Sequence, residues 1–298
     1  MVRDTASRDF SKKASTLICI MAYGAAFAAA AVTASLMKDY GGIAAAFSAD
    51  AAATAVVFMF SVGFNNSSMY DPYWSVAPLP IALFWALVAE GGAIGARGLA
   101  VMVLVAAWGT RLTYNWYRQW KGLVHEDWRY EDFRNRTGRF YWPVSFLGIH
   151  FFPTVMVFLG CLSMYPVMTA GSADPWFLDG VALFVTASAV IVETLADKQL
   201  NRFVKANPPK ESILSTGLWA YSRHPNYFGE ISFWWGLFLF SLAADGFHWW
   251  TIIGPLAITI MFITVSIPMM ERRMLSRRPL YAERQRKVSM LVPWFRKK

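Results

Sequence analysis

Eight stretches of this 298-residue chain are apolar enough to enter a bilayer. They lie at about 14–36, 43–63, 76–90, 98–117, 144–168, 176–196, 227–245 and 248–270. A membrane-spanning helix needs about 20 apolar residues; the third stretch is shorter, and the fourth ends in polar residues. The pattern predicts an all-α fold, a polytopic integral membrane helical bundle with seven or eight transmembrane helices.

The composition agrees with a membrane protein. Only 16% of the residues are charged, whereas soluble domains carry about 25%. Cys19 and Cys161 both lie inside apolar runs, which predicts buried small hydrophobic side chains rather than a disulfide or metal ligands. The first apolar run lacks a small-residue cleavage site after it, so we expect no cleavable signal peptide. Because both cysteines lie in apolar runs, we expect no metal site.

The basic residues behind the net charge of +9 lie mostly on one side of the predicted membrane spans. Of the 28 lysines and arginines, 25 lie before 14–36, after 98–117, after 176–196, or in the tail from residue 271. Lys38 and Arg97 fall on the other side, and Arg111 lies within 98–117. The positive-inside rule therefore predicts that both termini lie in the cytoplasm. Membrane lipids, rather than nucleic acid, are the expected partners of these cations.

The chain contains no apparent repeat or low-complexity linker, which predicts a single membrane domain over 1–298. Its first half is rich in alanine and glycine, as in "AAFAAAAVTAS", and small residues let membrane helices approach closely. We assign these first helices a packing role only. The later loops, "YNWYRQWKGLVHEDWRYEDFRNRTGRFYWP" among them, are long, polar and aromatic. Such loops can order around a ligand or lie as amphipathic segments at the membrane surface.

The stretch "YSRHPNYFGE", 221–230, places polar groups at the start of an apolar helix. Pro225 fits the first turn of a helix, so the helix should begin at Pro225 or Asn226. Free N–H groups at a helix N-terminus attract anions, and Arg223 with His224 would add a phosphate clamp. Glu230, one turn inside, could accept hydrogen bonds from a ribose or an amide. The alternatives are a membrane anchor for Arg223 and a helix-start hydrogen bond for His224.

Two further polar sets have helical spacing. Glu193, Asp197 and Asn201 share one face of the sixth stretch and need partners, such as Arg202 or Arg223. They form either a binding set or a structural ion pair. The second set occupies one side of the fourth stretch: Arg111, Tyr114, Asn115 and Arg118. Its Tyr114 hydroxyl could polarise a buried carbonyl; the alternatives are interfacial packing of Tyr114 and snorkelling of Arg118.

The loop 65–75, "NNSSMYDPYWS", carries no lysine or arginine although it should face the cytoplasm. Either the loop dips into the protein or Asp71-Pro72 forms an ordinary turn. In the tail, Glu271 lies where the last apolar stretch ends. The arginines that follow it could bind a phosphate or lipid headgroups.

Several of these motifs resemble the bacterial branch of the steroid 5α-reductase-like membrane family. They are "TYNWYRQWKGLVHEDWRY", "ETLADKQLNRF", "GLWAYSRHPNYFGE", "WWGLFL", "SIPMMERRML" and "VPWF", and the similarity covers about 65–298, with 1–64 similar only in being apolar. The wider superfamily includes sterol C14 and Δ7 reductases and isoprenylcysteine carboxyl methyltransferases. The resemblance implies a helical membrane fold whose C-terminal half encloses a nucleotide reached from the cytoplasm, NADPH in the reductases.

The resemblance also implies roles for single residues. Asp197 matches a cofactor-binding acid, Asn226 and Glu230 match the "N-x-x-G-E" segment, and Arg223 with His224 matches the Arg-His pair of sterol reductases. Tyr114 or Asn115 matches the tyrosine that holds the substrate carbonyl. Its partner glutamate is missing, so Asn65, Asn66 or Asp71 would have to substitute. The expected cofactor-binding residues are Arg118, Glu193, Asp197, Asn201, Tyr221, Arg223, His224, Asn226, Tyr227, Glu230, Glu271 and Arg272.

The expected function is NADPH-dependent reduction of a carbon–carbon double bond conjugated to a carbonyl in a hydrophobic, steroid-like or other lipid enone. The missing glutamate, and the absence of the family's His-rich segment near Glu271, weaken the steroid assignment. The alternatives are a methyltransferase that uses S-adenosylmethionine and a non-catalytic lipid-binding membrane protein. The substrate and the oligomeric state do not follow from the sequence.

Overall fold

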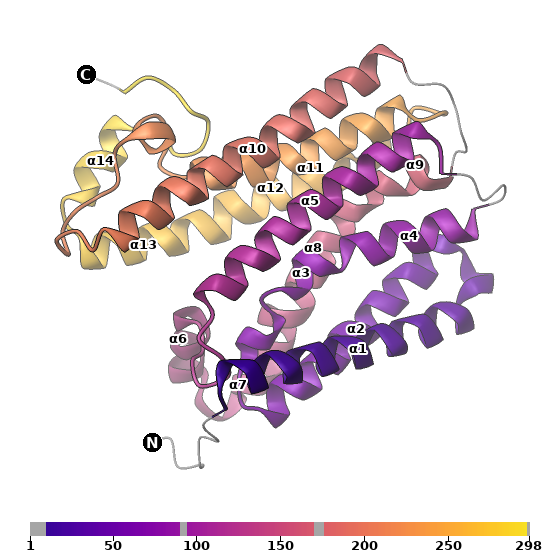
Figure 1. The fold of residues 1–298 in the computed structure, drawn as a ribbon, viewed down its shortest axis with the longest axis horizontal. Helices are drawn as coiled ribbons and strands as arrows, with labels where there is room; N and C mark the ends of the chain where they lie inside the picture. Colours follow the sequence, from indigo (N-terminus) through magenta and orange to yellow (C-terminus); the bar gives the residue numbers. More distant parts are fainter. Residues whose placement is uncertain (1–9, 90–93, 170–175, 297–298) are drawn as a thin grey trace. The chain divides into compact units, whose positions relative to one another are not determined.

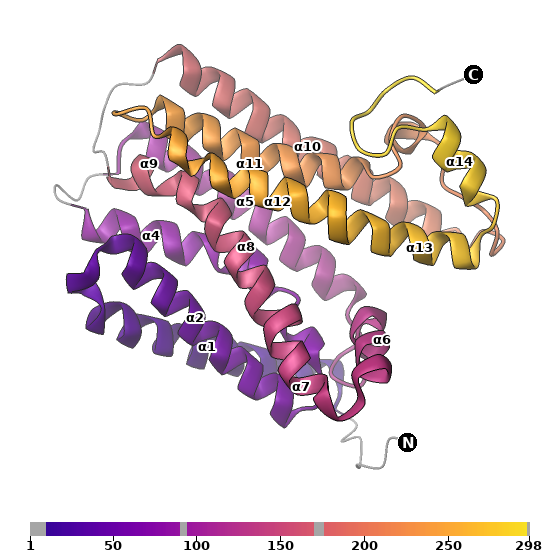
Figure 2. The same ribbon diagram turned by 180° about the vertical axis from the view of Figure 1, so that it is seen from behind.

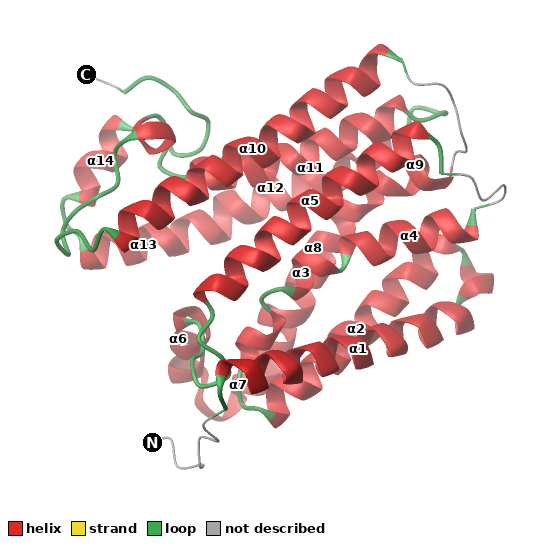
Figure 3. Cartoon of the chain, viewed as in Figure 1, coloured by secondary structure: helices red, strands yellow, loops and turns green. Residues whose placement is uncertain are grey.

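The computed structural model describes residues 10–89, 94–169 and 176–296. Over these residues the predicted all-α fold is confirmed, because the chain consists of helices and loops with one isolated bridge between Ser222 and Ser289 (Figure 3). Four pieces of the sequence predictions lie outside the described residues. They are Arg3, Arg8, position 90 at the end of the stretch 76–90, and the last two lysines.

The helices follow one another along the chain (Figure 1). They are α1 Lys12–Leu36, α2 Gly42–Gly63, α3 Tyr73–Val76, α4 Pro78–Val88, α5 Ala96–Gln119, α6 Trp128–Thr137, α7 Tyr141–Val144, α8 Phe152–Cys161, α9 Tyr165–Thr169, α10 Phe177–Lys205, α11 Pro225–Ala243, α12 Ile253–Met261, α13 Ile267–Arg277 and α14 Tyr281–Lys287. Two π-helical segments, Ser145–Phe151 and Phe262–Ser266, join α7 to α8 and α12 to α13.

Within the described residues, five helical stretches are long and apolar enough to cross a membrane, which makes this a polytopic membrane protein. They are Lys12–Leu36, Gly42–Gly63, Trp128–Thr169, Phe177–Lys205 and Trp249–Arg277, and each overlaps one predicted span. The other three predicted spans correspond to α4, which has 11 residues, and to α5 and α11, which are diluted by polar residues at one end. The count of seven or eight spans therefore stays a prediction.

The chain divides into two compact units. Unit 1 comprises Met1–Gly92 and Trp108–Cys161, and unit 2 comprises Ala93–Ala107 and Leu162–Lys298. Helix α5 contributes residues to both. The single membrane domain over 1–298 stays a prediction.

In unit 1, α1 and α2 lie side by side in both views (Figures 1 and 2). Their facing positions are small and fully or nearly fully buried: Ala22, Ala26, Ala45, Ala46, Ala49 and Ala53. Small side chains let the two backbones approach, which is the packing that drives helix association where apolar burial gives no advantage over lipid. A core of Val57, Tyr70 and Tyr73 continues from this seam.

In unit 2, α10 and α11 form the longest helix contact, and two glycines of α11 make it possible (Figure 1). A Cβ atom at Gly229 would lie 2.7 Å from the Glu193 Cβ and 2.9 Å from the Ala189 carbonyl oxygen. A Cβ atom at Gly236 would lie 3.0 Å from the Thr186 Cα. The two helices therefore touch backbone to backbone at two levels.

Gly236→Ala should lower the free energy of unfolding by about 1–3 kcal/mol, because the added methyl group overpacks the α10–α11 contact. Gly180→Ala is the matched control: Gly180 lies on α10 and nothing approaches its Cβ position within 4 Å. Alanine has the higher helix propensity, so the control should be neutral or slightly stabilised. Thermal unfolding in detergent measures both variants, and equal melting temperatures would contradict the close contact.

Two local predictions are confirmed. Helix α11 begins at Pro225, with His224 as its N-cap residue, as the proline indicated. Cys19 and Cys161 are free thiols with 7% and 0% exposure, buried among apolar neighbours.

Candidate functional site

The polar loop 65–75 lies inside unit 1, which confirms that it dips into the protein. Asn66 and Ser68 are 2% exposed, and Ser67 is fully buried. The Asn66 side chain accepts a hydrogen bond from the Ser68 N–H at 2.9 Å and so caps a 3₁₀ turn over Ser67–Tyr70. Its amide nitrogen donates to the carbonyl oxygens of Leu123 and His125 at 2.8 and 3.0 Å. This one side chain therefore ties the loop to the segment 123–127.

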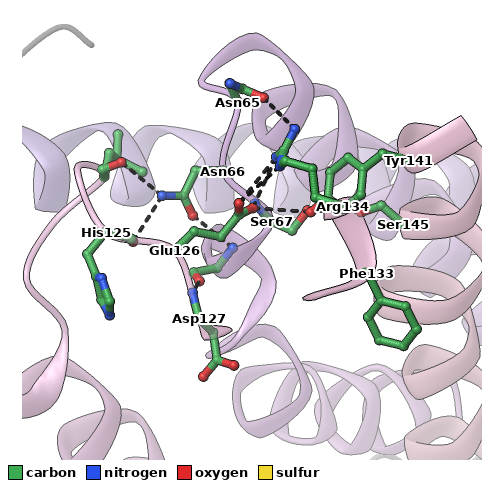
Figure 4. Close-up of polar contacts among 12 residues, drawn as sticks. Asn65, Asn66, Ser67, His125, Glu126, Asp127, Phe133, Arg134, Tyr141 and Ser145 are labelled. Atoms are coloured by element: carbon green, nitrogen blue, oxygen red, sulfur yellow. Dashed lines mark hydrogen bonds and ion pairs between the residues drawn. The ribbon is translucent and has the colours of Figure 1, made fainter. Parts of the chain in front are cut away.

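Glu126 is the centre of the resulting polar cluster (Figure 4). Its Oε1 accepts from the Ser67 N–H at 2.8 Å and from the Tyr141 hydroxyl at 3.1 Å. Arg134 Nη2 lies 3.2 Å from its Oε2, and the guanidinium stacks 3.8 Å above the Tyr141 ring. With 2% exposure, Glu126 is a buried carboxylate whose charge is balanced by Arg134. We call Asn66, Ser67, Glu126, Arg134 and Tyr141 the Glu126 cluster.

Asn65 completes the Glu126 cluster from outside. Its φ of 52° lies in the left-handed region, which asparagine tolerates better than most residues. In this conformation its Oδ1 accepts from Arg134 Nη1 at 3.0 Å. The sequence prediction singled out the loop but not Glu126, although Glu126 stands in the quoted motif "GLVHEDWRY". Two signals could have indicated this contact: the acid in the motif "GLVHEDWRY", and the polar loop 65–75 that carries no cation.

Asp71, a predicted substitute for the missing glutamate, lies next to a second tyrosine of unit 1. The Tyr130 hydroxyl donates to Asp71 Oδ1 at 2.5 Å, and Arg129 Nη2 lies 3.8 Å from the same oxygen. Burial raises the pKa of the Asp71 carboxyl to about 6, with Arg129 opposing the increase. Asp71 is thus a carboxyl group that changes charge close to neutral pH.

Asp71 should make stability depend on pH. Its folded-state pKa lies above the ordinary value of 3.8, so its stabilising contribution is complete below that value and is lost as pH rises through about 6. Asp71→Asn keeps an oxygen acceptor for Tyr130 but cannot titrate. The melting temperature of the variant, relative to the wild type, should therefore increase between about pH 4.5 and 7.5. A constant difference across that range would contradict the shifted pKa.

In unit 2, four side chains converge on Glu271. Arg223 Nε and Nη2 lie 2.6 and 3.4 Å from its two carboxylate oxygens. His224 Nε2 lies 3.1 Å from Oε1, and Gln285 Nε2 donates to Oε2 at 2.7 Å. The Tyr281 hydroxyl is 3.4 Å away. We call Arg223, His224, Glu271, Tyr281 and Gln285 the Glu271 cluster.

The Glu271 cluster fastens the C-terminal segment to the start of α11. Arg223 Nη1 donates to the carbonyl oxygens of Gln285 and Val288 at 2.7 and 2.8 Å, and the Arg223 N–H donates to the Ser289 carbonyl at 2.9 Å. Arg284 binds the carbonyl oxygens of Trp219 and Ser222. The Arg223 ion pair is thus with Glu271, and its guanidinium positions the turn before α11.

The remaining predicted residues of unit 2 are distributed over α10, α11 and their flanks. The His224 and Tyr227 rings stack at 5.3 Å. Glu230 is 3% exposed and accepts from Trp234 Nε1 at 2.8 Å. Glu193 is 4% exposed and lies against Gly229, whereas Asp197, Asn201 and Asn226 are half-buried. Tyr221 and Arg272 are exposed.

The predicted catalytic residues belong to unit 1. Tyr114 is 58% exposed on α5, and the Arg118 guanidinium lies 5.5 Å from its ring centre. Asn115 and Arg111 are half-buried on the same helix. The structure thus brings Tyr114 next to Arg118, and Arg223 and His224 next to Glu271. The approach of the substrate residues to the cofactor residues stays a prediction. Among the described residues, no group of three or more histidine, cysteine, aspartate or glutamate side chains could hold a metal ion.

The apolar helices define the class: a polytopic helical membrane protein. Residues 57–288 match the model of the family described as Protein of unknown function (DUF1295), so the chain belongs to that family. It is 30% identical over 265 residues to the uncharacterized protein C594.04c of Schizosaccharomyces pombe. The aligned region covers 80% of this chain and 76% of that relative. No solved structure matches. The matched range contains both the Glu126 cluster and the Glu271 cluster.

Proposed function

We propose that this protein reduces a carbon–carbon double bond conjugated to a carbonyl in a hydrophobic enone, with NADPH as the reductant. The observation that carries the proposal is the Glu271 cluster. Arg223 and His224 match the Arg-His pair that the steroid 5α-reductase-like resemblance implies for the nucleotide, and Glu271 is a further residue expected to bind the cofactor. Glu271 lies 48 residues beyond Arg223 and 47 beyond His224 in the sequence, and the three meet at the N-terminus of α11.

The donor set at this end of α11 fits a nucleotide. The first-turn N–H groups of a helix have no intrahelical acceptor and present a partial positive charge to a phosphate. Pro225 has no N–H, and the His224 N–H donates to Ser222 Oγ at 3.1 Å. Because Arg223 is bound to Glu271, we assign the phosphate contact to the backbone N–H groups of Asn226 and Tyr227 and to the exposed Arg272. Asn226, half-buried in the first turn, would contact a sugar or an amide. Arg223 and His224 would hold the turn in its binding conformation.

When bound, NADPH supplies a hydride, and the chain must supply the rest of the reaction. A hydrogen-bond donor near the substrate carbonyl stabilises the negative charge that develops on its oxygen. Tyr114 and Asn115 are the proposed donors, since they lie at the polar end of α5. The substrate class is a steroid-like or other lipid enone that enters from the bilayer.

Thermal unfolding with added ligand tests the proposal. NADPH should raise the melting temperature by linkage, whereas S-adenosylmethionine should not. Asn226→Ala should weaken NADPH binding by about 1–3 kcal/mol, the usual loss for one buried hydrogen bond. Asn135→Ala, an exposed asparagine on α6, is the control and should bind like the wild type. Stabilisation by S-adenosylmethionine alone would favour the methyltransferase, and stabilisation by lipid alone would favour a lipid-binding protein.

The charge distribution supports a cofactor site that faces the cytoplasm of a bacterial inner membrane. The same experiment in membrane vesicles tests this orientation. NADPH should bind to the protein in inside-out vesicles and not in sealed right-side-out vesicles, because a charged nucleotide does not cross the bilayer. Binding in right-side-out vesicles would contradict it.

A further inference from the structure

Asp50 is an acidic side chain buried inside the second membrane-spanning helix, α2. It is 5% exposed, and its Oδ1 accepts from the Tyr73 hydroxyl at 2.6 Å. Its Oδ2 is buried and has no hydrogen-bond partner within the described part of the chain. None of the ion pairs among the described residues includes Asp50. The titratable groups that face it are all neutral ones: Tyr73, Tyr70 and Cys161.

The position of Asp50 makes a negative charge costly. At 1.5 Å per residue, Asp50 lies about 12 Å from the Gly42 end of α2 and about 20 Å from the Gly63 end. An ionised carboxylate at such depth loses its hydration, and without a cation the loss is not repaid. Binding a proton removes the charge.

Hydroxyl groups surround this acid. Tyr73 contacts Thr54 as well as Asp50. Thr54 Oγ1 lies 2.7 Å from Thr154 Oγ1, which lies 2.7 Å from the Tyr70 hydroxyl. Each hydroxyl can both donate and accept a hydrogen bond. This inner chain leads from Asp50 through Tyr73 and Thr54 to Tyr70, with printed hydrogen-bond distances from Asp50 to Tyr73 and from Thr54 through Thr154 to Tyr70.

A second chain of hydrogen bonds leads inward from the Glu126 cluster (Figure 4). Tyr141 bonds Glu126, and Ser67 Oγ lies 2.7 Å from the Tyr141 hydroxyl and 2.9 Å from Ser145 Oγ. Ser145 Oγ lies 3.4 Å from Nδ1 of His150. His150 is fully buried in the π-helical segment Ser145–Phe151, a geometry frequent at functional sites. Its ring centre lies 4.9 Å from that of Tyr70, so the outer chain ends beside the inner chain.

We infer that Asp50 carries a proton inside unit 1 and exchanges it with the Glu126 cluster through these hydroxyl groups and His150. Each hydroxyl accepts one proton and releases another. His150 exchanges a proton with Ser145 Oγ at Nδ1, and its Nε2 lies 3.1 Å from Ser61 Oγ. The step between His150 and the Tyr70 hydroxyl therefore requires the imidazole ring to turn toward Tyr70. One proton moves in total, with no oxidation or reduction. The inference is independent of the proposed cofactor and substrate.

Infrared spectroscopy of the purified protein tests the proton on Asp50. At about pH 7, above the pKa of about 6 of Asp71, the wild type should show a C=O stretch of a protonated carboxylic acid. Asp50→Asn should abolish this band. Tyr73→Phe keeps the acid but removes its hydrogen bond, so the band should move to higher frequency. A band that persists in Asp50→Asn, or that keeps its position in Tyr73→Phe, would overturn the inference.

Exchange with deuterated water tests the path. Transfer to D₂O shifts the carboxylic acid band, and the half-time of the shift reports proton exchange at Asp50. Ser145→Ala breaks the outer chain and should lengthen this half-time about tenfold, as one lost hydrogen bond raises the barrier by about 1.4 kcal/mol. Ser75→Ala removes another buried hydroxyl of unit 1, outside the path, and should exchange like the wild type. Equal half-times in the wild type and Ser145→Ala, or equal slowing in both variants, would overturn the path.

Discussion

Glu271→Ala should lower the free energy of unfolding by about 3–5 kcal/mol, the usual effect of removing one partner from a buried ion pair. The side chains of Arg223 and Glu271 are only 10% and 11% exposed. The substitution leaves the Arg223 charge buried without its counter-charge and removes the acceptor of His224 and Gln285. Chemical or thermal unfolding in detergent measures the loss.

Glu283→Ala is the control for this experiment. Glu283 forms an ion pair with Lys287 at 2.8 Å, but both side chains are 55% exposed. Exposed pairs of this kind contribute about 0.2–1 kcal/mol at most. If Glu271→Ala unfolds as readily as Glu283→Ala and no more, Glu271 does not hold the C-terminal segment to α11.

Tyr114→Phe should leave NADPH binding intact and reduce turnover of a hydrophobic enone by about 10²–10³, the usual effect of losing one donor to a developing oxyanion. The ring and its contact with Arg118 remain, and only the hydroxyl is lost. The loss of NADPH absorbance with a panel of 3-keto-4-ene steroids and other lipid enones measures the rate. Asp197→Ala should act mainly through NADPH affinity.

Tyr117→Phe is the matched control for the hydroxyl of Tyr114. Tyr117 is also exposed on α5, and its ring lies 4.4 Å from the Lys12 ammonium. Its turnover should equal that of the wild type. Full activity in Tyr114→Phe would transfer the role to Asn115 or to the loop 65–75. If the protein binds NADPH but turns over none of the enones, the reductase class would still stand, but the steroid-like substrate would be contradicted.

The sequence predicted the features that depend on neighbouring residues. Apolar runs located the helices, and Pro225 fixed the first residue of α11 because proline suits a first turn and no later one. The lack of cations in 65–75 indicated a buried loop. In each case the signal and the structure lie within a few residues of each other.

Contacts between distant segments could not be predicted in this way. Arg223 was expected near acids of α10 or a phosphate, but its partner Glu271 lies 48 residues further along the chain. Glu126 likewise has two partners from other segments, Ser67 and Tyr141. The first helices were given a packing role only, yet α2 contributes Asp50 and Thr54 to a polar network. A single sequence carries no signal for which of many polar residues will meet.

The backbone contact at Gly229 and Gly236 has a consequence for motion. Helices that meet through side chains can slide by switching rotamers, but α10 and α11 touch with nothing between them that can rearrange. Helices α10 and α11 should therefore move together as one rigid body. Movement around the start of α11 is then left to the segment 206–224 and to the tail beyond α13, while Glu193 and Glu230 keep a constant separation.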